Sequence, residues 1–179
     1  IGLLHSARWR SQAAEILPRL GQLVGTDGAR VAVAEAAVAM LQSDGVVPQL
    51  SALLCGLARG ASNDAARLAV AAAIAAAGEW GHVAVASDPV LEAVALLARG
   101  AASDAVRASL CRALCCVAAG GDKLEGVEAV RRLGGALAAM GEAAEGDDVR
   151  GMVADVISAV TACDLEVEQR AALAREDVW

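Results

Sequence analysis

The chain has no phenylalanine and no tyrosine, and only three of its 179 residues are tryptophan. Even so, 57% of its residues are hydrophobic, so Ala, Val and Leu carry most of the apolar content. Strands are typically rich in aromatic and β-branched residues, whereas Ala and Leu are strong helix formers. The composition therefore predicts an all-α protein whose helices pack closely through small side chains.

Long apolar runs are also missing, although the mean hydropathy is positive at +0.51. The longest stretches without a charge, residues 45–58 and 68–78, are shorter than the roughly 20 apolar residues that a membrane-spanning helix needs. We therefore expect no membrane span. The chain does not begin with Met, and residues 1–12 lack a long apolar core, so we interpret this end as an internal or trimmed start rather than a signal peptide.

Basic residues are outnumbered by acidic ones, 15 against 22, which gives a net charge of −7. Duplex binding draws most of its affinity from Lys and Arg contacts to phosphates. The charge balance therefore argues against nucleic acid as a partner.

Sites of chemistry are sparse. The two histidines, His5 and His82, lie far apart, and no glycine-rich phosphate loop occurs. We expect no catalytic residue, no metal and no cofactor. The five cysteines lie in apolar helical sequence without CxxC spacing, and we interpret them as buried thiols of an intracellular, reducing compartment, with metal or disulfide use as the alternative. Cytoplasm is the favoured location, and an organelle or cilium is the alternative. The cysteines are Cys55, Cys111, Cys115, Cys116 and Cys163.

One stretch of sequence occurs twice: "LARGASNDAAR" at residues 57–67 and "LARGAASDAVR" at 97–107. Its Asp-x-x-Arg element occurs four times, at Asp27, Asp64, Asp104 and Asp147, with spacings of 37, 40 and 43 residues. Six, ten and thirteen residues after each Asp stand apolar residues, which trace one stripe of a helix. The repeat therefore predicts four long helices, each with its Asp as N-cap.

A second apolar-periodic run precedes each Asp, and in three copies it follows Pro18, Pro48 or Pro89. Each unit would contain a short helix or turn, such as residues 79–87 or 121–126, then a helix of about eleven residues, a loop and a helix of about fifteen. Such a unit buries its apolar face only by stacking on its neighbours. We therefore predict a right-handed α-solenoid of about four repeats.

The chain resembles the armadillo/HEAT superfamily of helical repeats. Residues 44–54, "DGVVPQLSALL", look like the start of an armadillo second helix, and residues 103–119 look like a third helix. Asp147–Arg150 is similar to HEAT repeats, so the choice between the two families stays open. The resemblance implies a repeat array over residues 1–163, with repeats near 11–42, 43–79, 80–120 and 121–163. Residues 164–179 would form a polar capping helix or a tail, with docking of this segment into another protein as the alternative.

The resemblance also implies that Asp and Arg of adjacent repeats form a ladder that ties neighbours together. A row of arginines that binds a ligand is the alternative interpretation. The ladder residues would be Asp27, Arg30, Asp64, Arg67, Asp104, Arg107, Asp147 and Arg150.

The concave face of such arrays is where partners bind. Importin-type armadillo proteins carry Trp and Asn at two concave positions of successive repeats. Glu35, Ala72, Arg112 and Asp155 stand at the Trp position here, so recognition of extended basic peptides is not implied. A smooth surface of small residues is better suited to a docked partner helix. The partner-binding residues that we predict are Glu35, Ala39, Ala76, Arg112, Cys116 and Asp155.

These observations predict a non-catalytic protein-interaction module, a scaffold or accessory subunit of a hetero-complex. The protein partner would lay a segment, which could be helical, on the concave face. The alternative is a HEAT-like chromophore lyase or a subunit of an enzyme complex.

Overall fold

A computed structural model describes residues 15–17, 19–44, 49–80, 87–119, 126–162 and 165–174. In these residues the chain is all-α and contains no strand. Residues 15–17 and 19–23 are helical, and eight further helices follow. They are α2 (Asp27–Asp44), α3 (Leu50–Gly60), α4 (Asp64–Glu79), α5 (Asp88–Gly100), α6 (Asp104–Ala119), α7 (Val127–Ala143), α8 (Asp147–Thr161) and α9 (Val167–Ala174).

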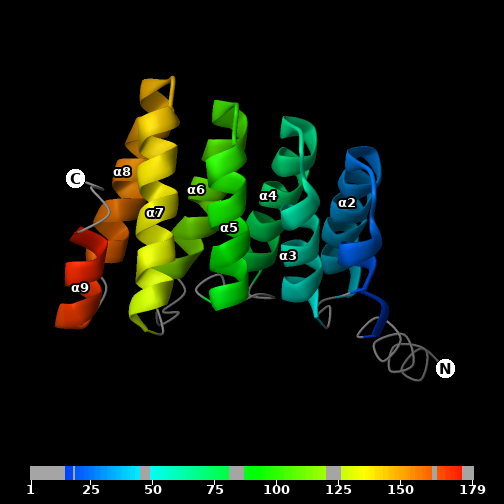
Figure 1. Ribbon diagram of the computed structural model, residues 1–179, viewed down its shortest axis with the longest axis horizontal. Coiled ribbons are helices and arrows are strands. Elements are labelled where there is room, and N and C mark those ends of the chain that lie inside the picture. Colours follow the sequence, from blue (N-terminus) through cyan, green and yellow to red (C-terminus); the bar gives the residue numbers. More distant parts are fainter. Residues whose placement is uncertain are drawn as a thin grey trace.

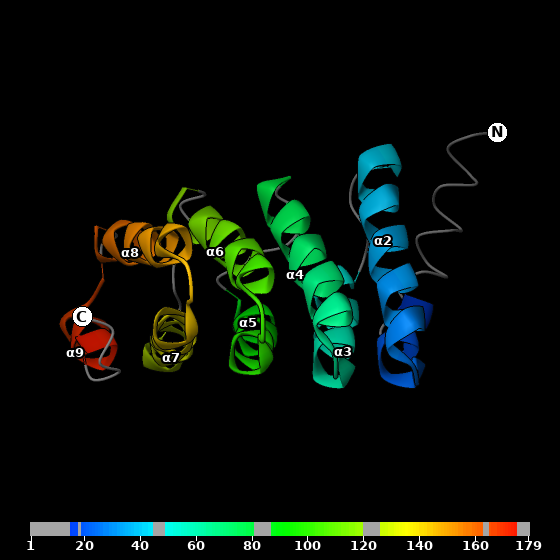
Figure 2. The same ribbon diagram turned by 90° about the horizontal axis from the view of Figure 1, so that it is seen from above.

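The helices form two layers (Figures 1 and 2). In one layer α2, α4, α6 and α8 contact one another in that order, and in the other α3, α5, α7 and α9 do the same. Successive helices of the chain therefore alternate between layers. The loops between α3 and α4, α5 and α6, and α7 and α8 all lie along one edge, at the top of Figure 1.

The four long helices begin at the four repeated aspartates, as the sequence predicts. In α2 and α4, however, the capping side chain belongs to the residue before the Asp. Thr26 Oγ1 accepts a hydrogen bond from the Ala29 amide, and Asn63 Oδ1 accepts one from the Ala66 amide. The prediction that Asp itself is the N-cap was therefore wrong by one position, which leaves the Asp carboxylate available for other donors.

The core lies between the two layers. The stripe predicted from the repeat faces it, because most residues six, ten and thirteen positions after each Asp are buried. Leucines of α3, α5 and α7 supply the opposite side. The largest fully buried side chains are Leu50, Leu53, Leu54, Leu57, Ile74, Leu91, Leu97, Leu110, Leu114, Leu133, Leu137 and Met140.

The end of the described chain continues one of the layers. Helix α9 packs against α7, in the same way as α7 packs against α5. The predicted short helices within residues 79–87 and 121–126 fall mostly outside the described residues, as do Pro18 and Pro48, whereas Pro89 lies in the first turn of α5. No helix in the described part of the chain is long and apolar enough to cross a membrane.

Candidate functional site

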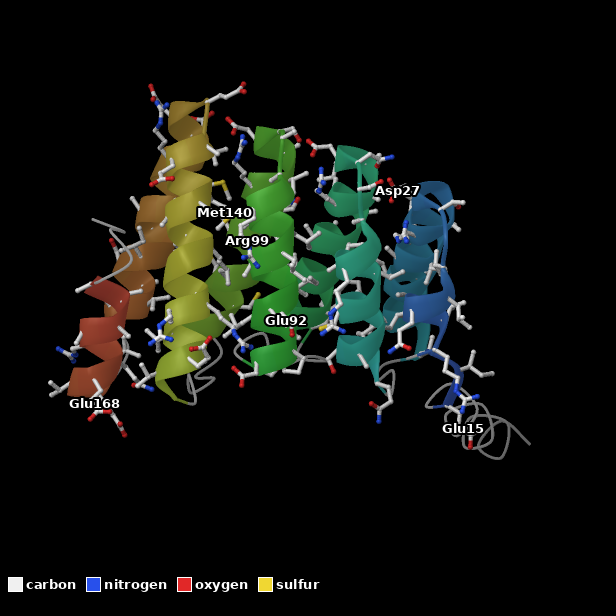
Figure 3. All side chains as sticks on the ribbon, viewed as in Figure 1. Glu15, Asp27, Glu92, Arg99, Met140 and Glu168 are labelled. Atoms are coloured by element: carbon white, nitrogen blue, oxygen red, sulfur yellow. The ribbon has the colours of Figure 1, made fainter. Side chains whose placement is uncertain are left out.

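The first aspartate of the repeat links two neighbouring long helices. Asp27, at the start of α2, accepts hydrogen bonds from the amides of Ser62 and Asn63 at 3.1 and 3.0 Å, and from the Ser62 hydroxyl at 2.5 Å. Ser62 and Asn63 are the two residues that precede α4. Asp27 lies at the edge that carries these loops (Figure 3). We call this contact, between an Asp and the two residues before the next long helix, an Asp–loop joint.

The same joint occurs twice more. Asp64 accepts a hydrogen bond from the Ala102 amide at 3.0 Å, just before α6. Asp104 accepts bonds from the amides of Glu145 and Gly146, just before α8, at 3.2 and 2.7 Å. At Asp27 and Asp104 the amide donors stand two residues and one residue before the next Asp. At Asp64 the amide of Ala102 stands two residues before Asp104, and the second donor is the side chain of Ser103. The Asp–loop joints therefore tie each long helix to the next one.

The arginines hold the aspartates in place within each helix. Arg107 donates from Nη1 to Asp104 at 2.6 Å and from Nη2 to the Ala101 carbonyl at 2.9 Å. Arg30 does the same with Asp27 and Val24. The prediction of Asp–Arg pairs between adjacent repeats was therefore wrong in its pairing, because each ion pair lies within one helix and backbone amides make the connection between helices.

The fourth pair differs from the others. Arg150 donates to Asp147 at 2.9 Å and to the Ala144 carbonyl at 2.8 Å, as Arg30 and Arg107 do in the first and third units. However, the Asp147 side chain is 96% exposed and that of Arg150 is 54% exposed. In the first pair the corresponding values for Asp27 and Arg30 are 12% and 13%.

The joints lower the pKa of their carboxyl groups. For Asp27 the largest cause is the hydrogen bond from the Ser62 side chain, and for Asp64 it is the one from the Ser103 side chain. For Asp104 the largest cause is the hydrogen bond from the Gly146 amide. Donors that favour the charged carboxylate lower its pKa.

This lowering predicts acid sensitivity. A native pKa below the unfolded value of about 3.9 gives stability that is present above that pH and is lost as pH falls through the native pKa. We expect the free energy of unfolding to decline on acidification below about pH 4. In the triple variant D27N/D64N/D104N, the free energy of unfolding should decline less over the same pH interval. Urea titrations at a series of pH values measure how steeply the free energy of unfolding declines in each protein. Equal slopes for the two proteins would exclude the Asp–loop joints as the cause of the acid sensitivity.

An apolar groove lies on the outer surface of the layer formed by α2, α4, α6 and α8. It has a volume of about 510 Å³ and runs between α2 and α4. Leu68, in α4, is 37% exposed there, and Glu35 is the charged side chain of the lining. Among the described residues, no Lys or Arg forms an ion pair with Glu35. The groove is lined by Val31, Glu35, Val38, Ala39, Ala65, Leu68, Ala69 and Ala72.

Two of the six predicted partner-binding residues, Glu35 and Ala39, line this groove. Ala76 lies further along α4, outside the lining, and is partly buried. On α6, the exposed Arg112 donates to the Ser109 hydroxyl at 3.0 Å, and the Cys116 thiol donates to the Arg112 carbonyl at 3.5 Å. The sixth residue, Asp155, is exposed on α8.

The sequence reasoning missed the larger apolar side chains of the groove. Val31 and Leu68 both stand four residues after the repeated Asp, where α6 and α8 have Ala108 and Gly151. The predicted smooth surface of small residues is therefore wrong for the α2–α4 end of the layer. The signal that was available is a large apolar residue at this position in only the first two units.

The prediction that the cysteines are buried holds only for some of them. Cys55 and Cys111 are buried, and burial raises the pKa of their thiols to about 11 and about 12. Cys115, in contrast, is exposed, so the prediction of burial was wrong for this residue. The thiol is still partly desolvated, and this desolvation, followed by the charge of Asp155, raises the pKa of Cys115. These three thiols are therefore protonated at neutral pH, and Cys163 lies outside the described residues.

No family model matches the chain, and comparisons with curated proteins and with solved structures find no match either.

Proposed function

We propose that this protein is a non-catalytic interaction module, a scaffold or accessory subunit that binds a segment of a partner protein on the α2/α4/α6/α8 surface. The observation that supports this function best is the groove of about 510 Å³ between α2 and α4. An exposed apolar patch costs solubility, and such patches mark interaction sites in soluble proteins.

The finer architecture that we propose is a right-handed α-solenoid of the armadillo/HEAT type with about four repeats. Its support is the alternation of contacts between two layers and the recurrence of the Asp–loop joint at Asp27, Asp64 and Asp104. Stacked repeats of this kind present extended surfaces of adjacent helices, which are suited to binding a partner chain.

The groove is best suited to a helical segment. Its lining residues on α2 are spaced at i, i+4, i+7 and i+8, and those on α4 at i, i+3, i+4 and i+7. Two parallel apolar stripes separated by a groove accept the apolar face of a third helix. A lysine or arginine on that helix would pair with Glu35, so the partner that we propose is an amphipathic helix with a basic residue beside its apolar stripe.

A charge placed in the groove tests this function. We expect Leu68→Glu to abolish co-purification of the partner from source cells, because the carboxylate would be buried against an apolar surface. Leu23→Glu is the matched control, since Leu23 is 78% exposed and lies outside the groove. Circular dichroism checks that both variants keep their helices. A partner that both variants retain equally would contradict the proposal.

A further inference from the structure

Asp147 and Arg150 are exposed and form the acceptor side of an Asp–loop joint. In the described part of the chain, no loop supplies the donor side of this joint. The other three aspartates accept backbone amides from the loop before the next long helix. Asp147 keeps the geometry of the acceptor half, with its arginine bonded at 2.9 Å and that arginine bonded to the Ala144 carbonyl at 2.8 Å. The Asp147 carboxylate is therefore held in the orientation of an acceptor, although its side chain is 96% exposed.

The rest of the same helix face is also open. The position seven residues after each Asp lies one turn beyond the arginine, on the side that faces the next long helix. In α2, α4 and α6 this position holds Ala34, Ala71 and Cys111, which are all fully buried. In α8 it holds Ala154, which is exposed. The face of α8 therefore repeats the small residue of the inner interfaces without a helix over it among the described residues.

Helix α9 already occupies the place next to α7 in the other layer. What would continue the series beside α8 is therefore one long helix together with the loop before it, and not a complete unit. The inner joints show what that loop must supply. It donates two consecutive backbone N–H groups at Asp27 and Asp104, and one backbone N–H at Asp64. The helix before it ends in a small residue, since Gly60 lies against Arg30 and Gly100 against Arg67. A Cβ built on Gly60 would lie 2.4 Å from Arg30 Nε.

We propose that the face of α8 containing Asp147, Arg150 and Ala154 is a second docking surface, which binds one partner helix through its preceding loop. The two free amides of that loop bind the Asp147 carboxylate, a Gly or Ala two residues before these amides lies on Arg150, and the helix packs on Ala154. Charge-assisted hydrogen bonds from amides to a carboxylate are the strong ones. This surface lies on α8, apart from the α2–α4 groove, and does not depend on the proposed function.

The test uses the full chain and a labelled peptide with the sequence of residues 143–161. This peptide contains the loop and helix that fill the joint at Asp104. We expect saturable binding by fluorescence anisotropy, and about tenfold weaker binding to Asp147→Ala because its charged acceptor is lost. Asp148→Ala removes the same charge from the next residue, which is also exposed in the first turn of α8. It should bind the peptide within about twofold of the unsubstituted chain.

Three results would overturn the proposal. The first is an absence of binding to the unsubstituted chain, and the second is an equal loss for Asp147→Ala and Asp148→Ala. The third is binding that is insensitive to Asp147 but lost in Asp104→Ala, which would mean that the peptide replaces α8 on α6. An Ala154→Trp variant adds an independent readout, because its indole would cover the small-residue face and weaken binding while Asp147 stays intact.

Discussion

Arg107→Ala is expected to lower the free energy of unfolding by about 2 kcal/mol, because it removes a buried guanidinium from an ion pair whose carboxylate is 27% exposed. The Arg107 side chain is only 4% exposed and bonds Asp104 at 2.6 Å. It also donates to the carbonyl of Ala101, which is itself buried. Alanine leaves both acceptors without this donor and leaves a void at the junction of α6 with the loop before it.

Arg150→Ala is the matched control for this prediction. Arg150 makes the same two hydrogen bonds, to Asp147 and to the Ala144 carbonyl. Its side chain is 54% exposed and its aspartate 96% exposed, so we expect a loss below about 1 kcal/mol. Urea unfolding followed by circular dichroism compares the two variants. Similar losses for both would mean that the burial of an Asp–Arg pair does not determine how much the pair contributes to stability.

Gly56→Ala is expected to cost about 2 kcal/mol, even though alanine is the better helix former, because the site is overpacked. A Cβ at Gly56 would lie 2.7 Å from the carbonyl carbon of Gly21, and one at Gly21 would lie 2.7 Å from the carbonyl oxygen of Leu53. Both contacts are with backbone, which cannot move aside as a flexible side chain would. The helical segment before α2 can therefore approach α3 this closely only through glycine.

The control for Gly56 is the glycine of α8, where a Cβ would meet nothing within 4 Å. Gly151→Ala should raise stability by up to about 1 kcal/mol through helix propensity alone. Thermal unfolding of the two variants should therefore shift the midpoint in opposite directions. A gain for Gly56→Ala would show that the segment of Gly21 does not pack on α3 as described.

The sequence contained enough information to predict the class of the long helices and their starts to within one residue. The Asp-x-x-Arg element and the apolar stripe behind it agree on the same four starts, at Asp27, Asp64, Asp104 and Asp147. This works because the element combines a local signal, a helix terminus, with the periodicity of a buried face. The helix terminus and the periodicity both depend on short stretches of neighbouring residues.

The partners of the aspartates could not be predicted in the same way. Two of the three donors to Asp27 are the backbone amides of Ser62 and Asn63, 35 and 36 residues away, and every residue type except proline carries such an amide. The groove could not be predicted from the sequence for a similar reason. Leu68 appears in the sequence as one more apolar residue of α4, and its partial exposure follows only from the way in which α2 and α4 pack together.

The most direct test of the central proposal is photo-cross-linking from the groove itself. A photoreactive amino acid would replace Leu68, with a second version of the protein carrying it at Glu142, which is exposed on α7 in the other layer. Irradiation in source cells should give one defined polypeptide adduct from position 68 and none from position 142, and mass spectrometry should place the link on an amphipathic helix with a basic residue. No polypeptide adduct from position 68, or the same adducts from both positions, would contradict the proposal that this groove binds a partner.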